Sequence, residues 1–276
     1  MLTSPLKWHG GKGGYHGKLA QWIVSLMPKH LHYVEPFAGG LSVLLAKDPN
    51  GISEVVNDTN GDLTNFWRVL ANPIDFKDFV RHVQACPFSE SLWQTAHEVL
   101  EQDRKLTNLN DRAVAFFIVV RQSLAGRLDT FAPVSRNRIR RGMNEQVSAW
   151  LSAVDGLSTV HERLKRVLIL NRPAIEVIRQ HDGPQTLFYL DPPYLHSTRA
   201  TTGEYGEHEM SRDDHIALQK LLATIKGKFL LSGYRSDLYD IAALECGWDC
   251  HEFKIPNCAA GGDKKRTMTE CVWTNF

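Results

Sequence analysis

The sequence predicts an α/β fold: a doubly wound, mostly parallel sheet of seven strands, with a terminal antiparallel hairpin and a helical insertion. Three observations predict it. Short apolar runs rich in β-forming residues recur along the chain, most are separated by segments of helical periodicity, and the last two have no helix between them. The predicted strands are residues 31–35, 53–57, 166–170, 186–190, 228–232, 248–255 and 268–275.

Helical periodicity is clearest before the first strand and before the fifth. Leu19, Trp22, Ile23 and Leu26 recur at the spacing i, i+3, i+4, i+7, and a second apolar stripe of this kind runs over 216–225. Strands that alternate with helices place a mostly parallel sheet between two layers of helices.

Two connections depart from this alternation. Only "PNCAAGGDKKR" joins the last two strands, so they should pair antiparallel. About 110 residues, roughly 58–165, separate the second and third strands without a clear strand, which is too long for an ordinary crossover. We therefore expect a catalytic domain formed by 1–60 and 161–276, and an inserted helical subdomain over 61–160. Insertions at the ligand-bearing edge of such a sheet usually select what is bound.

Composition limits the classes of function. The chain of 276 residues is 43% hydrophobic and 23% charged with a formal net charge of +1, so any contact with a polyanion must come from local clusters. No run approaches 18 apolar residues and the N-terminus lacks the apolar core of a signal peptide, so we expect a cytoplasmic protein.

The five cysteines are odd in number and unevenly spread, which favours reduced thiols. Cys246, Cys250, His251 and Cys258 are a poor match to the spacing of structural zinc sites, and we expect no metal.

The segment "FYLDPPYLHSTR" carries the most specific chemistry. Asp191 directly follows a predicted strand, at the edge where open α/β sheets bind ligands. Pro192 and Pro193 lack N–H groups and have a fixed φ, so their carbonyls are free to accept hydrogen bonds. A carboxylate and a rigid carbonyl together can accept both N–H groups of one planar amino group, while Tyr194 stacks on the attached ring. The alternative is a motif that merely ends a strand.

Two further strand ends suit a nucleoside ligand without phosphates. "VEPFAGG" leaves a strand through Glu35 and two glycines that permit close backbone approach, and Glu35 would repel a pyrophosphate but suit a cationic amino acid part. Asp58, 23 residues later, stands where this topology places a carboxylate for ribose hydroxyls. Solvated acids at two ordinary turns are the alternative.

The N-terminal "PLKWHGGKGGYHGK" is rich in glycine but does not match a phosphate-binding P-loop, since Leu19 stands where that motif has Ser or Thr. It is either a flexible arm or a loop in which Trp8 packs on a ligand and Lys12 faces a carboxylate.

Basic residues gather in two places that favour phosphate contact over a merely solvated surface. The segment from residue 121 to 141 contains six arginines and one acidic residue, Asp129, which gives it a local charge of +5. The second cluster lies in the loop of the terminal hairpin. The predicted DNA-binding residues are Arg121, Arg127, Arg136, Arg138, Arg140, Arg141, Lys264, Lys265 and Arg266.

Five segments in order, "LKWHGGK", "VEPFAGG", "VNDTNGDL", "FYLDPPY" and "GGDKKRTMTECVW", together resemble the Dam-type adenine-specific DNA methyltransferases. The similarity covers 5–46, 53–63 and 186–276 and leaves most of the insertion unmatched. It implies the methyltransferase (Rossmann-like) variant of the fold, with target recognition and DNA binding in the insertion. The arginine-rich segment differs from the family's aromatic-rich region, so a GATC target is not predicted.

The resemblance also implies S-adenosyl-L-methionine as cofactor. The cofactor contacts that it implies are Trp8, Lys12, Glu35, Phe37, Gly39, Asp58 and Asp191.

For the reaction, we expect methyl transfer to the exocyclic N6 amino group of adenine in double-stranded DNA, with the base turned out of the duplex. Asp191 and the Pro192 carbonyl would hold the amino protons and Tyr194 would stack on the base. Adenine in RNA, a glutamine amide in a protein, or a catalytically silent DNA-binding regulator on this scaffold are the alternatives.

Overall fold

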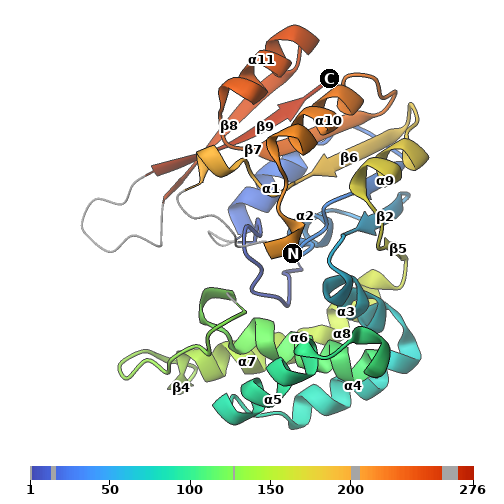
Figure 1. The fold of residues 1–276 in the computed structure, drawn as a ribbon. Coiled ribbons are helices and arrows are strands. Elements are labelled where there is room, and N and C mark those ends of the chain that lie inside the picture. The colour runs from blue at the N-terminus through green and yellow to red at the C-terminus, as the bar shows by residue number, and fades with distance from the viewer. Residues whose placement is uncertain (1, 14–16, 127, 200–205, 257–266) are drawn as a thin grey trace. The chain divides into compact units, whose positions relative to one another are not determined.

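The computed structural model describes residues 2–13, 17–126, 128–199, 206–256 and 267–276 (Figure 1). It contains the predicted seven-stranded sheet, with every strand end within one residue of its predicted position. The strands are β1 (His32–Glu35), β2 (Ser53–Asn57), β5 (Val167–Leu170), β6 (Thr186–Leu190), β7 (Lys228–Gly233), β8 (Asp249–Pro256) and β9 (Thr267–Thr274).

The strands lie in the order β5-β2-β1-β6-β7-β9-β8. β1 pairs parallel with β2 and β6, and β6 pairs parallel with β7. β9 is antiparallel to both β7 and β8, which confirms the terminal hairpin. All five residues of β6 are buried, as expected for a strand covered on both faces, which is why "TLFYL" does not alternate with polar residues.

The chain divides into two compact units. Unit 1 comprises residues 1–12, 39–46 and 60–171, and unit 2 comprises 13–38, 47–59 and 172–276.

Unit 1 is largely helical. Its helices are α2 (Ser42–Ala46), α3 (Gly61–Ala71), α4 (Pro73–Ala85), α5 (Glu90–Glu101), η2 (Arg104–Leu106), α6 (Leu109–Gln122), η3 (Leu124–Gly126), α7 (Glu145–Asp155) and α8 (Leu157–Leu164). Side chains of Asn60, Asn72, Ser89, Asn108 and Asn144 accept hydrogen bonds from the first turns of α3 to α7, so each of these helices starts at a polar cap encoded in the sequence.

Helix α6 forms the centre of unit 1. Ala113 and residues 115–120 are all buried, so the helix is apolar on nearly every side. Phe117 stacks on Phe66 of α3 with ring centroids 5.6 Å apart, and it meets Phe79 of α4 and Trp150 of α7 at 5.8 and 5.3 Å. These rings give unit 1 a core of its own.

A two-stranded hairpin interrupts the helices of unit 1, in a segment where no clear strand was predicted. It consists of β3 (Ile139–Arg140) and β4 (Met143–Asn144). Arg141 and Gly142 form the connection and have φ of 55° and 75°, the left-handed backbone of a type I′ turn.

Unit 2 carries the helices α1 (Lys18–Ser25), α9 (Ala174–His181), η4 (His196–Thr198), η5 (Gly206–His208), α10 (Arg212–Leu222) and α11 (Asp237–Cys246). The helix predicted around Leu19 is confirmed, with Leu19, Ala20 and Ile23 buried. The helix predicted over 216–225 begins earlier, because Ser211 and Asp214 form a capping box at its start.

No helix among the described residues is long and apolar enough to cross a membrane. The cytoplasmic location stays a prediction.

Candidate active site

Three predicted site residues lie where adjacent parallel strands of unit 2 end. Glu35 is the last residue of β1, Asp58 follows β2, and Asp191 follows β6. β1 lies between β2 and β6, with Glu35 in register with Val56 and Val34 with Phe188. The carboxyl ends of the three strands therefore form one edge, the position of ligands in open α/β sheets.

Glu35 is a buried carboxylate with 1% exposure. The Tyr33 hydroxyl donates a hydrogen bond to Glu35 Oε1 at 2.6 Å. The pKa of Tyr33 is raised well above its usual value, mainly because the hydroxyl is buried and secondly because the Glu35 carboxylate is near. A carboxylate held in low dielectric at a ligand-bearing edge suits a cationic amino group.

Asn57, which the sequence analysis missed, fixes the turn after β1. Its side-chain amide donates to the carbonyls of Pro36 and Arg172, both at 3.0 Å, and its Oδ1 accepts from the Arg172 N–H at 2.9 Å. The Ala38 N–H donates to the Asn57 carbonyl at 2.8 Å. Asn57 is fully buried and immediately precedes half-buried Asp58, so its place in "VVNDTN" was the available signal.

Asp191, Pro192 and Tyr194 leave β6 in unit 2. Pro192 is buried, whereas Asp191 and Tyr194 are half-buried. The hydroxyl of Tyr194 donates to Glu270 Oε1 on β9, and its ring meets Tyr234 edge-on, with centroids 4.8 Å apart and planes at 81°. Burial, with the carboxylates of Asp191 and Glu270, raises the pKa of Tyr194 well above its usual value.

Glu270 and Tyr234 are also residues that sequence reasoning missed. Glu270 belongs to the segment "MTECVW", which was predicted as part of the last strand and of a family motif, without a role for its glutamate. Its polar side chain in the middle of a buried strand was the signal.

Trp8 and Gly39, predicted to contact the cofactor, lie together in unit 1. Gly39 has φ of 46°, and a Cβ there would stand 3.0 Å from Trp8 Cδ1 and Nε1. Trp67 donates its indole N–H to the Gly39 carbonyl at 3.1 Å, and the Trp8 ring lies 6.0 Å from that of Phe116. Glycine is thus required where the chain passes the indole of Trp8.

Two more predicted cofactor residues differ in burial. Lys12 in unit 1 is 5% exposed and its ammonium donates to the Gly10 carbonyl at 3.1 Å. Phe37 in unit 2 is half-buried in the turn after β1.

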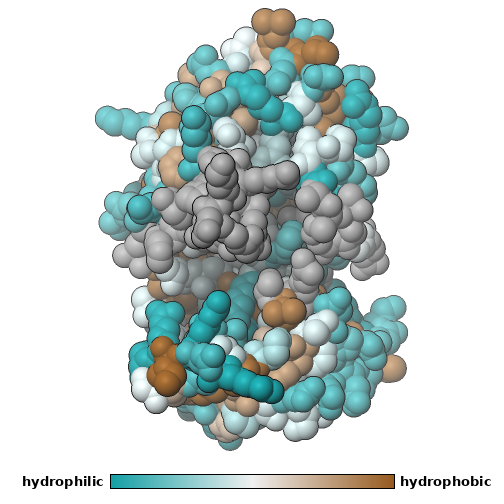
Figure 2. All heavy atoms as spheres, turned by 90° about the vertical axis from the view of Figure 1, so that its left-hand side faces the viewer, coloured by the Kyte–Doolittle hydropathy of each residue, from teal (hydrophilic) through white to brown (hydrophobic). Residues whose placement is uncertain are grey.

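Four of the predicted DNA-binding arginines surround the β3–β4 hairpin. Arg136, Arg138, Arg140 and Arg141 are all exposed. Arg138 lies 3.4 Å from the Glu145 carboxylate, and Arg141 donates to Ser152 Oγ at 2.7 Å. Figure 2 views the side on which the hairpin lies in Figure 1, and hydrophilic atoms dominate there with a few exposed apolar residues among them. Ile139 is 77% exposed and lies between Arg138 and Arg140 in the sequence.

Arg121 is different from these arginines. It lies on α6, half-buried, and donates to the Ala149 carbonyl of α7 at 2.6 Å, while burial lowers its pKa to about 10. This geometry makes it a tie between two helices. Arg127, Lys264, Lys265 and Arg266 lie outside the described residues.

Among the described residues, no group of three or more His, Cys, Asp or Glu side chains could hold a metal ion. Cys258, one member of the zinc set weighed from the sequence, lies outside those residues.

Comparison with known proteins identifies the family. The family model of D12 class N6 adenine-specific DNA methyltransferases matches residues 8–256. The chain is also 21% identical over 248 residues to the type II methyltransferase M.CviBI of Paramecium bursaria Chlorella virus NC1A, with 85% of each chain covered. Both findings agree with the five ordered motifs and with the strand order β2-β1-β6, in which Asp58, Glu35 and Asp191 stand at the carboxyl ends of neighbouring strands. The chain belongs to the D12 class of N6 adenine-specific DNA methyltransferases and is an enzyme that methylates adenine in DNA.

Proposed function

We propose that this enzyme takes its methyl group from S-adenosyl-L-methionine and transfers it to the N6 amino group of an adenine turned out of double-stranded DNA. The observation that carries the proposal is the position of Asp191 and Pro192 after β6, at the edge that Glu35 and Asp58 share. The family membership supplies the reaction and the DNA substrate.

The residues at this edge fit the chemistry of the donor. When bound, S-adenosyl-L-methionine supplies a methyl group already activated by a sulfonium. Buried Glu35 would pair with its amino group, and Asp58 would accept from the ribose hydroxyls. Asn57 supports the positions of Glu35 and Asp58, because its side chain forms hydrogen bonds with the backbone of Pro36, in the turn after β1, and with the backbone of Arg172. Trp8, Lys12, Phe37 and Gly39 complete the proposed contacts on the family resemblance.

At the acceptor, Asp191 and the Pro192 carbonyl would each accept one N–H of the adenine amino group. Holding both hydrogens would orient the amino group and draw electron density onto its nitrogen, whose lone pair would form the N–CH3 bond as the S–CH3 bond breaks. The nitrogen would then give up one proton, and S-adenosyl-L-homocysteine would leave. The proline ring keeps its carbonyl in place, because φ is fixed. Catalysis by these groups is positioning and electrostatic stabilisation. Tyr194 would stack on the extruded base.

For the polymer, the exposed arginines at the β3–β4 hairpin support contact with phosphates. The similar viral protein is named a type II methyltransferase, which supports a role of this enzyme in restriction-modification.

The test measures transfer of tritium from S-adenosyl-L-[methyl-³H]methionine to duplex DNA, single-stranded DNA, RNA and protein in parallel. We expect label in duplex DNA, and none with Asp191→Ala, whose binding to DNA should stay within about twofold of wild type. Asp213→Ala, an exposed acid on α10, is the matched control and should retain full activity.

Label in RNA or protein alone would replace the proposed substrate. Retained turnover in Asp191→Ala would remove Asp191 from the mechanism. DNA binding without label in any polymer would favour the silent regulator.

A further inference from the structure

A buried carboxylate from a distant strand contacts the aromatic residue of the active-site loop. Glu270 on β9 is 3% exposed and lies next to three fully buried apolar residues, Cys271, Val272 and Trp273. It accepts the hydrogen bond of the Tyr194 hydroxyl, 76 residues earlier in the chain. Burying a carboxylate costs several kcal/mol unless it is paired or hydrogen-bonded, so a Glu at this position needs such partners.

The ring of Tyr194 is constrained a second time by Tyr234, edge-on at 4.8 Å. Tyr234 follows Gly233 at the end of β7, and a Cβ on Gly233 would stand 3.0 Å from Trp273 Cζ3. Glycine therefore lets β7 pass close to β9 before Tyr234 turns toward Tyr194. Tyr194, Tyr234, Gly233 and Thr198 line one small pocket. The hydrogen bond to Glu270 fixes the hydroxyl end of the Tyr194 ring, and the edge-on contact with Tyr234 fixes the plane of the ring.

The Tyr194 hydroxyl stays protonated at any working pH. Burial is the main cause, and the nearby carboxylates of Asp191 and Glu270 act in the same direction, so the pKa of Tyr194 is raised well above its usual value. A protonated phenol is a permanent donor to Glu270, and its ring is neutral, as suits stacking on a neutral base.

We propose that Glu270 is a positioning residue for methyl transfer: its carboxylate holds the Tyr194 hydroxyl so that the ring is already oriented when the adenine enters. The inference rests on the proposed function, in which Tyr194 stacks on the base. Pre-ordering the ring removes part of the entropy cost of binding the base and places its amino group against Asp191. Glu270 therefore acts through Tyr194, on acceptor binding and transfer and not on binding of the methyl donor.

The test is a double-mutant cycle of Tyr194→Phe and Glu270→Leu, with single-turnover methylation of unmethylated duplex DNA as the measured rate. Each single variant should lower the rate by about tenfold or more, the range of one hydrogen bond to a charged group. The double variant should be no slower than the slower single variant, because both remove the same interaction. Calorimetric affinity for S-adenosyl-L-methionine should stay within about twofold.

Two further variants separate this role from a merely structural one. Glu270→Gln keeps an acceptor for the tyrosine and should recover the rate to within about threefold of wild type. Glu252→Leu, on neighbouring β8 and paired with Arg235, is the control and should leave the rate unchanged. If Glu270→Leu does not fold, the test uses Tyr194→Phe and Glu270→Gln. The methylation rate should fall in the first and stay near wild type in the second, and the affinity for S-adenosyl-L-methionine should be unchanged in both.

Additive losses, unchanged rates, or an equal loss of donor affinity would overturn the inference. A wild type that labels no DNA would overturn the proposed function together with it. An active wild type and inactive Asp191→Ala, with Tyr194→Phe and Glu270→Leu at wild-type rates, would overturn this inference alone.

Discussion

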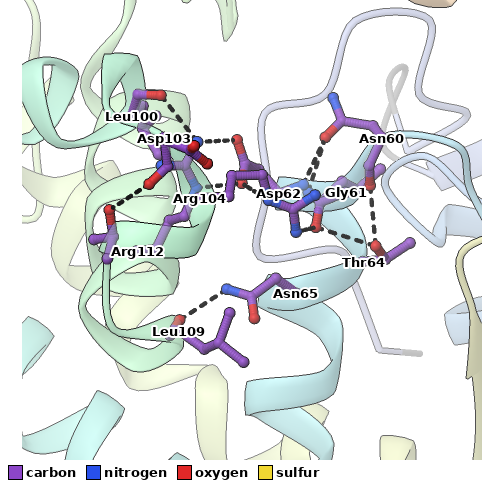
Figure 3. A network of polar contacts seen from close by, with 12 residues as sticks. Asn60, Gly61, Asp62, Thr64, Asn65, Leu100, Asp103, Arg104, Leu109 and Arg112 are labelled. Carbon is purple, nitrogen blue, oxygen red and sulfur yellow. Dashed lines mark hydrogen bonds and ion pairs between the residues drawn. The ribbon is translucent and has the colours of Figure 1, made fainter.

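Arg112 on α6 holds both carboxylate oxygens of Asp62 on α3, with Nε–Oδ1 at 2.6 Å and Nη2–Oδ2 at 2.9 Å (Figure 3). Its remaining N–H groups donate to the carbonyls of Val99, Leu100 and Gln102 at the end of α5. One 3% exposed guanidinium thus ties three helices of unit 1 together and satisfies carbonyls that the end of α5 would leave unpaired.

Arg112→Met should lower the free energy of unfolding by about 2 to 3 kcal/mol, because it removes the donor of three carbonyls and one of the two arginines that pair with Asp62, leaving Arg104 at 3.1 Å. Urea unfolding followed by circular dichroism measures the loss. The exposed pair Arg81–Asp78, 3.6 Å apart, is the comparison, and Arg81→Met should cost less than about 1 kcal/mol. Equal losses in the two variants would contradict the role given to Arg112.

Phosphate contact by the β3–β4 hairpin should appear in the salt dependence of DNA binding. The double variant Arg138→Ala/Arg140→Ala should reduce the slope of log K against log salt by about 2, since each contact contributes about 0.9. Fluorescence anisotropy of a labelled duplex at several salt concentrations measures the slope. Lys77→Ala, an exposed cation on α4, should leave it unchanged, and an unchanged slope in the arginine variant would refute the contact.

Gly39→Ala should weaken binding of S-adenosyl-L-methionine by about fivefold or more, because the added Cβ meets the Trp8 ring at 3.0 Å. Gly51→Ala is a matched control: Gly51 also has positive φ, 71°, but nothing lies within 4 Å of its Cβ position. Both variants carry the left-handed strain of about 1 kcal/mol. Calorimetry that finds equal affinity in the two variants would show that Trp8 does not contribute to the donor site.

His215 on α10 should make the protein less stable in mild acid. It is fully buried, its Nδ1 lies 2.8 Å from the Tyr239 hydroxyl, and burial lowers its pKa to about 4 against the partial opposition of Asp214. The unfolded chain, with a His pKa near 6.5, binds the proton first, so stability falls as pH drops from about 6.5 to about 4.

The loss should reach about 3 kcal/mol at the acid end of this window. His215→Asn, which keeps a polar atom near Tyr239, should flatten the decline seen in urea titrations at several pH values. A decline of the same steepness in the variant would mean that other groups cause it.

The sheet could be predicted from local patterns because its strands are short apolar runs bounded by polar or turn residues. β6 is buried throughout and β7 is buried except at Lys228, so a run of apolar residue types predicts both strands. The β3–β4 hairpin lacks this signal: its strands are two residues each, they are not buried, and Arg141-Gly142 is not one of the usual type I′ pairs.

The predicted site residues at strand ends share one edge because the topology requires it. Their supports were not predictable, since they join segments distant in sequence: Glu270 meets Tyr194 across 76 residues and Asn57 meets Arg172 across 115. Such pairs depend on which strands become neighbours, and periodicity does not report that. Arg121 was predicted to bind DNA from the local charge alone. A count of charges cannot distinguish an exposed arginine from one whose guanidinium donates a hydrogen bond to a helix carbonyl.

The aromatic centre around α6 has an evolutionary consequence. Because α6 finds its apolar neighbours within unit 1, the outer surfaces of that unit can accumulate changes without loosening the strands that carry Glu35 and Asp191. If the helical insertion selects the target sequence, as the family resemblance implies, target preference and methylation chemistry can diverge at different speeds in related lineages.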